Sequence, residues 1–110
     1  MAKFPTPGTM IHLVTLQDSS KVDDGGAGKR VAWHDVADVW AEVEPISSRE
    51  RFYAHQVKAE ISHRVKIRYR DGVKPSMRIR HEEKYYLIDS AIDMAGARRF
   101  LELLCTEVLG

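Results

Sequence analysis

The chain has 110 residues, of which 44% are hydrophobic and 30% charged, and this suits one globular domain, residues 1–110, with a core of its own. The formal net charge of +1 excludes the strong imbalance that points to DNA, a membrane surface or an acidic ligand. The single cysteine, Cys105, excludes an intrachain disulfide, and the sequence has neither an apolar stretch of the roughly 20 residues that cross a bilayer nor a secretory signal.

The N-terminal segment, residues 1–9, is predicted to be an extended arm, because Pro5 and Pro7 do not fit a helix there. Residues 10–17 follow as the first predicted strand, and both of its faces begin with apolar side chains. Residues 18–35 are poor in apolar side chains and rich in turn formers, so we predict a long glycine-rich loop. Unstructured connections longer than about 12–15 residues are uncommon unless they are functional or disordered. Two interpretations therefore stay open: a surface loop without function, and a segment that orders against a partner.

A second predicted strand, residues 36–46, has one apolar and one acidic face. The acidic face carries Asp38, Glu42 and Glu44. A short helix is predicted next, over about residues 48–59. Its start is indicated by Ser47 and Glu50, which form a capping box in front of apolar residues at helical spacing.

Three further strands are predicted over residues 61–70, 77–80 and 85–89, since apolar and polar residues alternate in each. The first two are predicted to form a hairpin whose outer face is basic and consists of Arg64, Lys66, Arg68, Arg70, Arg78 and Arg80. One interpretation is that this face contacts the phosphate backbone of a nucleic acid. The other, which the near-zero net charge favours, is that it pairs with the acidic face of the second strand, because opposite charges on neighbouring strands fix register. Charged strand faces also suit contact with a second copy of the chain.

The C-terminal segment fits two structures. A helix is indicated by apolar residues at helical spacing, namely Phe100, Leu101, Leu104, Cys105, Val108 and Leu109. Such a helix would have Asp93 as its N-cap and Gly110 past its end. A strand is indicated by the alternation of Leu101, Leu103 and Cys105. Periodicity slightly favours the helix.

Residues that could carry catalysis or hold a cofactor are sparse. The glycine-rich segment lacks a P-loop, because Asp23 stands at the first glycine position and Arg30 at the position of the hydroxyl residue. No metal site is predicted, since no pair at three- or four-residue spacing occurs among His12, His34, His55, His63 and His81. Cys105 lies in an apolar run, where cysteine is usually inert, and no Gly-x-Ser-x-Gly motif is present. We therefore predict neither an enzyme nor a cofactor.

Several segments in a fixed order carry a resemblance to a known family. They read WHDV (33–36), VWAEVEP (39–45), HRVKIRY (63–69), MRI (77–79), YLI (86–88) and LELLC (101–105), with Glu50 and Ala54 after the second segment. In this order they resemble the head–tail joining proteins of tailed phages and prophages, also called head-closure or head–tail adaptor proteins. The resemblance covers about residues 10–107. It departs at the turn of Glu82 and Glu83, where relatives usually have a glycine.

The resemblance implies a mainly β fold, a small antiparallel β-barrel or sandwich. The short helix would connect the second and third strands, and the long loop would connect the first and second. It makes the C-terminal segment a strand, against the helical periodicity. It also implies a structural virion protein without catalytic activity, which forms a ring beneath the portal and its adaptor, closes the DNA-filled head and docks the tail.

Partners and location follow from the same resemblance. The chain would form a homo-oligomeric ring in the particle, be monomeric when isolated, and contact the portal or adaptor ring and tail-completion proteins, with packaged DNA nearby. It would reside in the virion after assembly in the cytoplasm of a bacterial host. The charged strand faces would pair neighbouring subunits, and the long loop would face the ring lumen or another ring through Asp18, Lys21, Asp23, Asp24, Gly25, Gly26, Gly28, Lys29 and Arg30. The alternative function is a free nucleic-acid-binding barrel, of the OB or SH3 type, that uses the basic hairpin.

Overall fold

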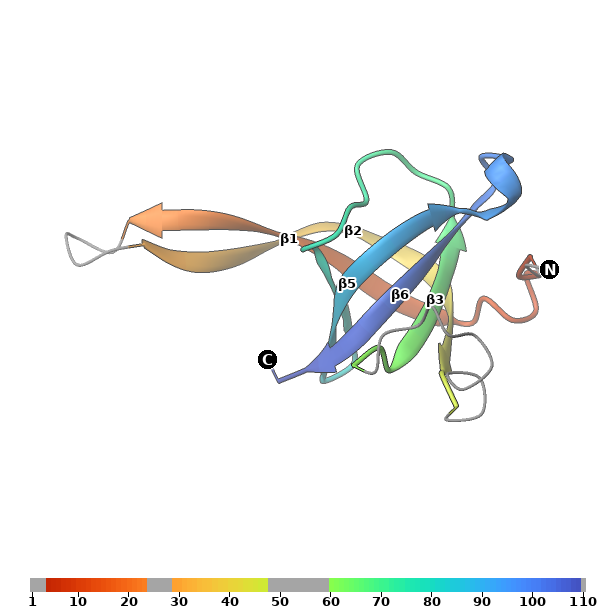
Figure 1. Ribbon diagram of the computed structural model, residues 1–110, viewed down its shortest axis with the longest axis horizontal. Coiled ribbons are helices and arrows are strands. Elements are labelled where there is room, and N and C mark those ends of the chain that lie inside the picture. The colour runs from red at the N-terminus through yellow and green to blue at the C-terminus, as the bar shows by residue number, and fades with distance from the viewer. Residues whose placement is uncertain (1–3, 24–28, 48–59, 110) are drawn as a thin grey trace.

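The computed structural model describes residues 4–23, 29–47 and 60–109. Their elements are β1 (His12–Asp23), β2 (Lys29–Pro45), β3 (His63–Arg68), β4 (Arg78–His81), β5 (Lys84–Asp93), the 3-10 turn η1 (Met94–Gly96) and β6 (Phe100–Val108). Neighbouring strands are antiparallel, and the order β1-β2-β3-β6-β5-β4 returns to β1, so the sheet closes into a barrel (Figure 1). The predicted mainly β barrel is thereby confirmed.

The barrel interior is a packed core, because each strand alternates between inward and outward positions. In β3, Val65 and Ile67 are fully buried, whereas Arg68 is exposed. The whole core consists of Val14, Leu16, Ala41, Val65, Ile67, Met77, Ile79, Tyr86, Ile88, Leu101, Leu103 and Cys105. Alternation in the sequence therefore predicts correctly which face of these strands turns inward.

A second, smaller apolar cluster lies where the N-terminal arm meets the start of β6. Met10, Met94 and Phe100 are buried there, and the ring of Phe4 lies 5.4 Å from that of Phe100. Phe100 alternates with Leu101, which belongs to the barrel core. The arm thus covers an aromatic side chain that β6 turns away from the core.

Beyond the barrel, β1 and β2 continue as a two-stranded antiparallel ribbon, which we define as residues 18–23 and 29–35. Its last pair is Asp23 opposite Lys29, and neither ribbon strand pairs with any other described strand. Figure 1 shows the ribbon extending from one side of the barrel, and the molecule measures 50 Å along its length against 28 and 26 Å across. The interpretation of residues 18–35 as an irregular loop is wrong for these two described segments. The ribbon contributes no residue to the core, so its sequence shows no apolar alternation that would indicate strands.

A β-bulge separates the barrel from the ribbon. Leu16 lies opposite Ala37 and Gln17 opposite Asp35, so Val36 has no partner across the pair. Bulges of this kind bend a strand and increase its local twist. The bulge therefore marks the point at which β1 and β2 leave the curved wall of the barrel.

Two other expectations concern the C-terminal segment and the helix. The C-terminal segment is strand β6, as the resemblance implies and against the helical periodicity. The periodicity misleads because β6 buries side chains on both faces: Leu103 and Cys105 in the core, and Phe100 under the arm. The predicted helix over residues 48–59 lies outside the described residues.

Candidate interaction surfaces

The ribbon holds the predicted loop residues that the structure describes. Asp18 and Lys21 lie on β1 and Arg30 on β2, and the last two are exposed. Asp23 and Lys29 form the last pair. Val31 is 56% exposed and adds an apolar side chain to this charged surface. Outside the described residues lie Asp24, Gly25, Gly26 and Gly28.

Arg78 of β4 fastens the ribbon where it leaves the barrel. Its guanidinium lies over the ring of Trp33 on β2 and over the ring of Tyr85 on β5, 4.3 and 4.1 Å from their centres. Its Nε donates a hydrogen bond of 2.6 Å to Oε1 of Gln17, whose Nε2 donates one of 2.7 Å to Oδ1 of Asp35. We call these five residues the ribbon root. The root ties the β2 strand of the ribbon, and Gln17 just before its β1 strand, to β4 and β5, so side chains as well as backbone fix the direction of the ribbon.

The ribbon root was not identifiable as a unit from the sequence, which assigns Arg78 only to a basic face. Its members meet because β1 lies between β2 and β4 in the closed sheet. Burial lowers the pKa of the Arg78 guanidinium, which still stays charged at neutral pH because arginine ionises only far above it. The one local feature that marks the root is the burial of Gln17, a polar side chain that is 5% exposed. This burial cannot be read from the sequence.

The predicted basic hairpin does not form, because β3 pairs with β2 and β6 whereas β4 pairs with β1 and β5. Two other strands separate β3 from β4 in either direction around the barrel. Arg64 and Lys66 therefore lie on a different side of the barrel from Arg78 and Arg80. The nucleic-acid interpretation thereby loses the continuous basic face on which it rests.

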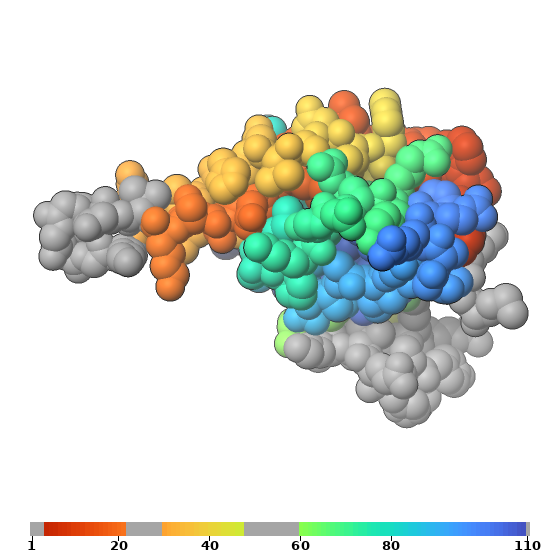
Figure 2. All heavy atoms as spheres, turned by 90° about the horizontal axis from the view of Figure 1, so that it is seen from above, coloured from red at the N-terminus to blue at the C-terminus, as the bar shows by residue number. Residues whose placement is uncertain are grey.

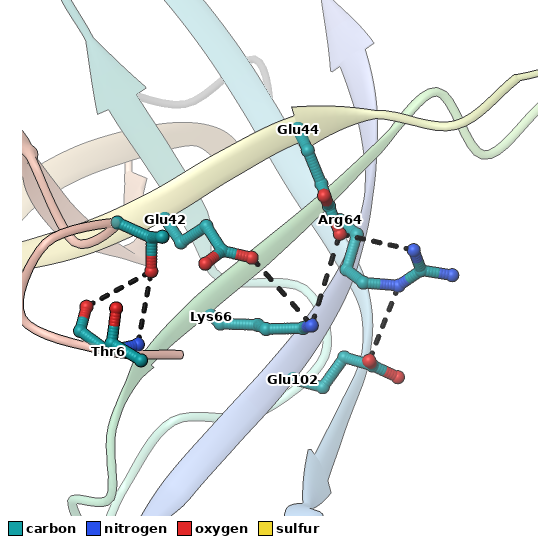
Figure 3. Close-up of polar contacts among 7 residues, drawn as sticks. Thr6, Glu42, Glu44, Arg64, Lys66 and Glu102 are labelled. Carbon is teal, nitrogen blue, oxygen red and sulfur yellow. Dashed lines mark hydrogen bonds and ion pairs between the residues drawn. The ribbon is translucent and has the colours of Figure 1, made fainter. Parts of the chain in front are cut away.

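Acidic and basic side chains pair across β2, β3 and β6, as Figure 3 shows. Arg64 lies 3.2 Å from Glu44 on β2 and 3.3 Å from Glu102 on β6. Lys66 Nζ lies 3.7 Å from Glu42 and 4.0 Å from Glu44. We call these five residues the ionic ladder. The prediction that the acidic face of the second strand pairs with basic residues is confirmed here, and the ladder leaves little charge to attract a ligand.

The other predicted charged residues of β2 and β4 meet near the ribbon root. Asp38 accepts a hydrogen bond of 2.7 Å from the hydroxyl of Thr15. Arg80 lies 3.7 Å from Asp35 and donates a longer hydrogen bond of 3.4 Å to the Thr15 hydroxyl. Asp38 thus does not pair directly with an arginine, contrary to the expectation for the acidic face.

Exposed apolar side chains gather beside the ionic ladder. Leu13 and Trp40 lie opposite each other on β1 and β2 and are 52% and 57% exposed, and Ile11 is 62% exposed. We call these three residues the apolar surface. Trp40 and Arg68 together line two hollows of about 420 and 240 Å³, and Ile11 lines the larger one. Trp40 shares the face of the second predicted strand that carries Asp38, Glu42 and Glu44, and the sequence indicates no role for it.

Among the described residues, no group of three or more His, Cys, Asp and Glu side chains is placed to hold a metal ion. That part of the chain also contains no helix that is long and apolar enough to cross a membrane. Cys105 is fully buried, and burial raises the pKa of its thiol to about 12. Burial has the opposite effect on His63, whose charged form is the protonated one: it lowers the pKa of the imidazole. The ring of His63 lies 4.7 Å from that of Tyr86.

The fold and these surfaces define a small closed β-barrel whose distinctive features lie on its outside: the ribbon, the ionic ladder and the apolar surface. Residues 5–108 match the family model of the phage head completion protein, and the chain belongs to this family. The resemblance to head–tail joining proteins that the sequence carries is thereby confirmed. The protein is a structural protein of phage particles.

The chain is also similar to individual known proteins. The chain is 26% identical over 92 residues to head completion protein gp16 of Bacillus phage SPP1, and the matched region covers 83% of this chain and 84% of gp16. The solution structure of protein SF1141 from Shigella flexneri 2a matches with a TM-score of 0.75 and 26% identity, over 94% of this chain and 96% of that one. A chain from the virion of a native gene transfer agent particle has the same fold, with a TM-score of 0.65, 19% identity and full coverage of both chains.

Proposed function

We propose that the protein assembles as a ring at the connector between phage head and tail, where it closes the DNA-filled head and presents a docking surface for the tail. Membership of the head completion family supports the place of action. The ribbon is the observation that carries the proposal further, because it extends from the barrel and contributes nothing to its core.

An extension of this kind is explained by a contact with another chain. Ordering the backbone takes about 1–2 kcal/mol per residue, and apolar burial normally offsets this. The ribbon buries no core residue, and its two outer edges pair with no described strand. A neighbouring chain that packs on the ribbon would supply the missing stabilisation. We assign this contact to the ring lumen or to an adjacent ring.

The proposed partners are the portal or adaptor ring on one side and tail-completion proteins on the other. Packaged DNA passes close to the ring, and the net charge of +1 keeps phosphate contacts few, so DNA slides past rather than binds. Assembly takes place in the cytoplasm of the bacterial host and ends in the virion. The role requires neither catalysis nor a cofactor.

The test removes the ribbon while keeping the barrel. Residues 21–31 are replaced by Asn-Gly, which joins the opposing residues Ser20 and Ala32 through a two-residue hairpin turn. We expect the purified variant to unfold within a few degrees of the native chain, since no core residue is removed. It should fail to restore infectious particles to a phage that lacks the protein. Full infectivity with the shortened ribbon would refute the role of the ribbon, and a control with only Val31→Thr should assemble normally.

A further inference from the structure

The two ends of the pairing between β5 and β6 carry opposite charge. This pairing runs from Tyr85 opposite Val108 to Asp93 opposite Leu101. Beside the Asp93 end lies a group that we call the arginine end, which consists of Arg68, Arg70, Arg98 and Arg99. Beside the Val108 end lies a group that we call the glutamate end, which consists of Glu82, Glu83 and Glu107.

The arginine end is held together by the chain that leaves β3 and the chain that enters β6. The amide of Tyr69 donates a hydrogen bond of 2.9 Å to the carbonyl of Arg99, and the Arg98 guanidinium lies 6.0 Å from the Tyr69 ring. Two carboxylates lie there as well: Asp71 accepts a hydrogen bond from the Tyr69 hydroxyl, and Asp93 accepts one from the Arg98 amide. None of the four guanidinium groups forms an ion pair with a carboxylate of the described chain.

The arginine end continues into the apolar surface. Arg68 lines both hollows beside Trp40, and Arg70 lines the smaller one together with Val39. Ile11 and Trp40 remain more than half exposed at these hollows. A complementary surface would therefore carry carboxylates next to an apolar side chain. Figure 2 shows the chain that follows β3, in green, beside the chain between β5 and β6, in blue.

The glutamate end has that composition. Glu82 and Glu83 form the turn between β4 and β5, and Glu107 lies next to it because it pairs with Tyr86. Burial and then the charges of Glu107 and Glu82 raise the pKa of Tyr86, which agrees with both carboxylates acting on one region. Within the described chain, the ring of His81 lies 3.9 Å from the carboxylate of Glu82, and Lys84 is the only lysine in the turn. Leu109, two residues after Glu107, is 99% exposed.

We propose that a second copy of the chain docks head to tail, with its glutamate end and Leu109 against the arginine end and apolar surface of the first copy. The inference rests on the proposed ring and names the surfaces that build it. Glu107 lies seven positions after Phe100 in β6, about 23 Å at roughly 3.3 Å per residue, so one copy can use both ends at once. A contact between two different surfaces closes into a ring when its rotation permits. DNA phosphates could pair with the arginines, but DNA would not account for the exposed side chain of Trp40 or for the carboxylates of the glutamate end.

The experiment introduces one thiol at each end. In the variant Arg70→Cys with Glu83→Cys, these are the reactive thiols, because the native Cys105 is fully buried. A bismaleimide reagent is added to concentrated protein and to assembled particles. The proposal predicts a ladder of linked multimers for this variant, and at most single links for either substitution alone. The control Arg70→Cys with Lys74→Cys keeps two exposed thiols but leaves the glutamate end intact, and it should give no ladder.

Charge reversal gives an independent measurement. The variants Arg68→Glu with Arg98→Glu and Glu82→Arg with Glu83→Arg should each associate at least tenfold more weakly than the native chain in sedimentation equilibrium. Mixing the two should restore association, because each reversed end then meets an opposite charge. No ladder in either sample, or no rescue on mixing, would overturn the proposed docking. Loss of binding to short duplex DNA in the arginine variant, with association unchanged, would also overturn it.

The outcome for the docking and the outcome for the proposed function are separable. Particles that contain the double-cysteine chain but give no ladder would refute the head-to-tail contact and leave the place of action intact. A chain that links into multimers in solution but is absent from particles would support the contact and refute the connector role.

Discussion

The barrel and the ribbon share strands β1 and β2 but depend on different interactions. In the barrel each of these strands has two neighbours and turns alternate side chains into the core, as Val14 and Leu16 do. In the ribbon each strand has one neighbour and no core beneath it. The ribbon root connects the two regions through side chains at the bulge, and the ion pair of Arg80 with Asp35 adds a second connection there. One pair of strands therefore supports the core at one end and, at the other, leaves the core for the contact with other chains proposed above.

The largest expected difference between the two regions concerns removal of apolar side chains. Leu103→Ala in the barrel should lower the free energy of unfolding by about 2–5 kcal/mol, because a fully buried leucine leaves a cavity. Val31→Ala in the ribbon, where the side chain is 56% exposed, should change it by less than about 0.5 kcal/mol. Urea unfolding of both variants measures the contrast. Equal losses would mean that the ribbon takes part in the cooperative core.

A smaller effect is expected at the ribbon root. Arg78→Met keeps the apolar stem but removes the charge over Trp33 and Tyr85 and the hydrogen bond to Gln17, which should cost about 1–2 kcal/mol. Amide hydrogen exchange should accelerate in the ribbon more than in β3 and β6. Arg30→Met, an exposed ribbon variant, is the control. Unchanged exchange in the ribbon of the Arg78 variant would show that the backbone alone holds the ribbon in place.

The closure of the barrel interior can be tested through Cys105. Its pKa is raised from 9.0 to about 12 in the fold, so above pH 9 the unfolded chain loses the thiol proton and the folded chain keeps it. Stability should therefore fall as pH rises above 9, by at most about 1.4 kcal/mol per pH unit for this one group. The measurement is the unfolding free energy at several pH values relative to Cys105→Ala, which lacks the group. Parallel curves for the two proteins would show that water reaches the thiol.

The smallest expected effect belongs to the ionic ladder on the barrel surface. Glu44→Gln removes a carboxylate that lies near both Arg64 and Lys66, and it should cost about 0.3–1 kcal/mol. The difference should shrink in about 1 M salt, where charges are screened within a few ångströms. Glu83→Gln should be neutral, because Glu83 lies in a turn and forms no ion pair with a lysine or arginine of the described chain. A loss that persists in high salt would assign the effect of Glu44 to packing instead of charge.

Strand positions within the barrel were predictable because burial on one side leaves a period of two in the sequence. Val65 and Ile67 show this most clearly: they are fully buried in the core and alternate with Arg64 and Lys66, whose charged groups lie in the ionic ladder on the outside. The ribbon was not predictable in the same way, since a pair of strands with no buried face has no such period. The secondary structure of β6 was ambiguous in the sequence because Phe100 is buried on the face opposite the core. It packs there against Phe4 of the N-terminal arm, and its apolar side chain interrupts the alternation of the strand.

The surfaces were less predictable than the strands, because they depend on which strands are neighbours. The basic residues of β3 and β4 follow one another in sequence and suggest one face, yet the closed order of the sheet places them apart. Pairing of Glu42 and Glu44 with Arg64 and Lys66 was predictable, since β2 and β3 are adjacent. The ribbon root and the arginine end each combine residues more than 25 positions apart, and no local pattern indicates them.

Core side chains fill the interior of the barrel, and this limits where another molecule could pass. Leu16, Ile67 and Leu103 have no solvent exposure, so the barrel formed by the described residues encloses no channel. In the proposed ring, anything that passes through the assembly would have to pass between protomers. The width of that opening would be set by how many protomers meet and at what angle, so it would respond to changes on their outer surfaces before it responds to a substitution inside one barrel.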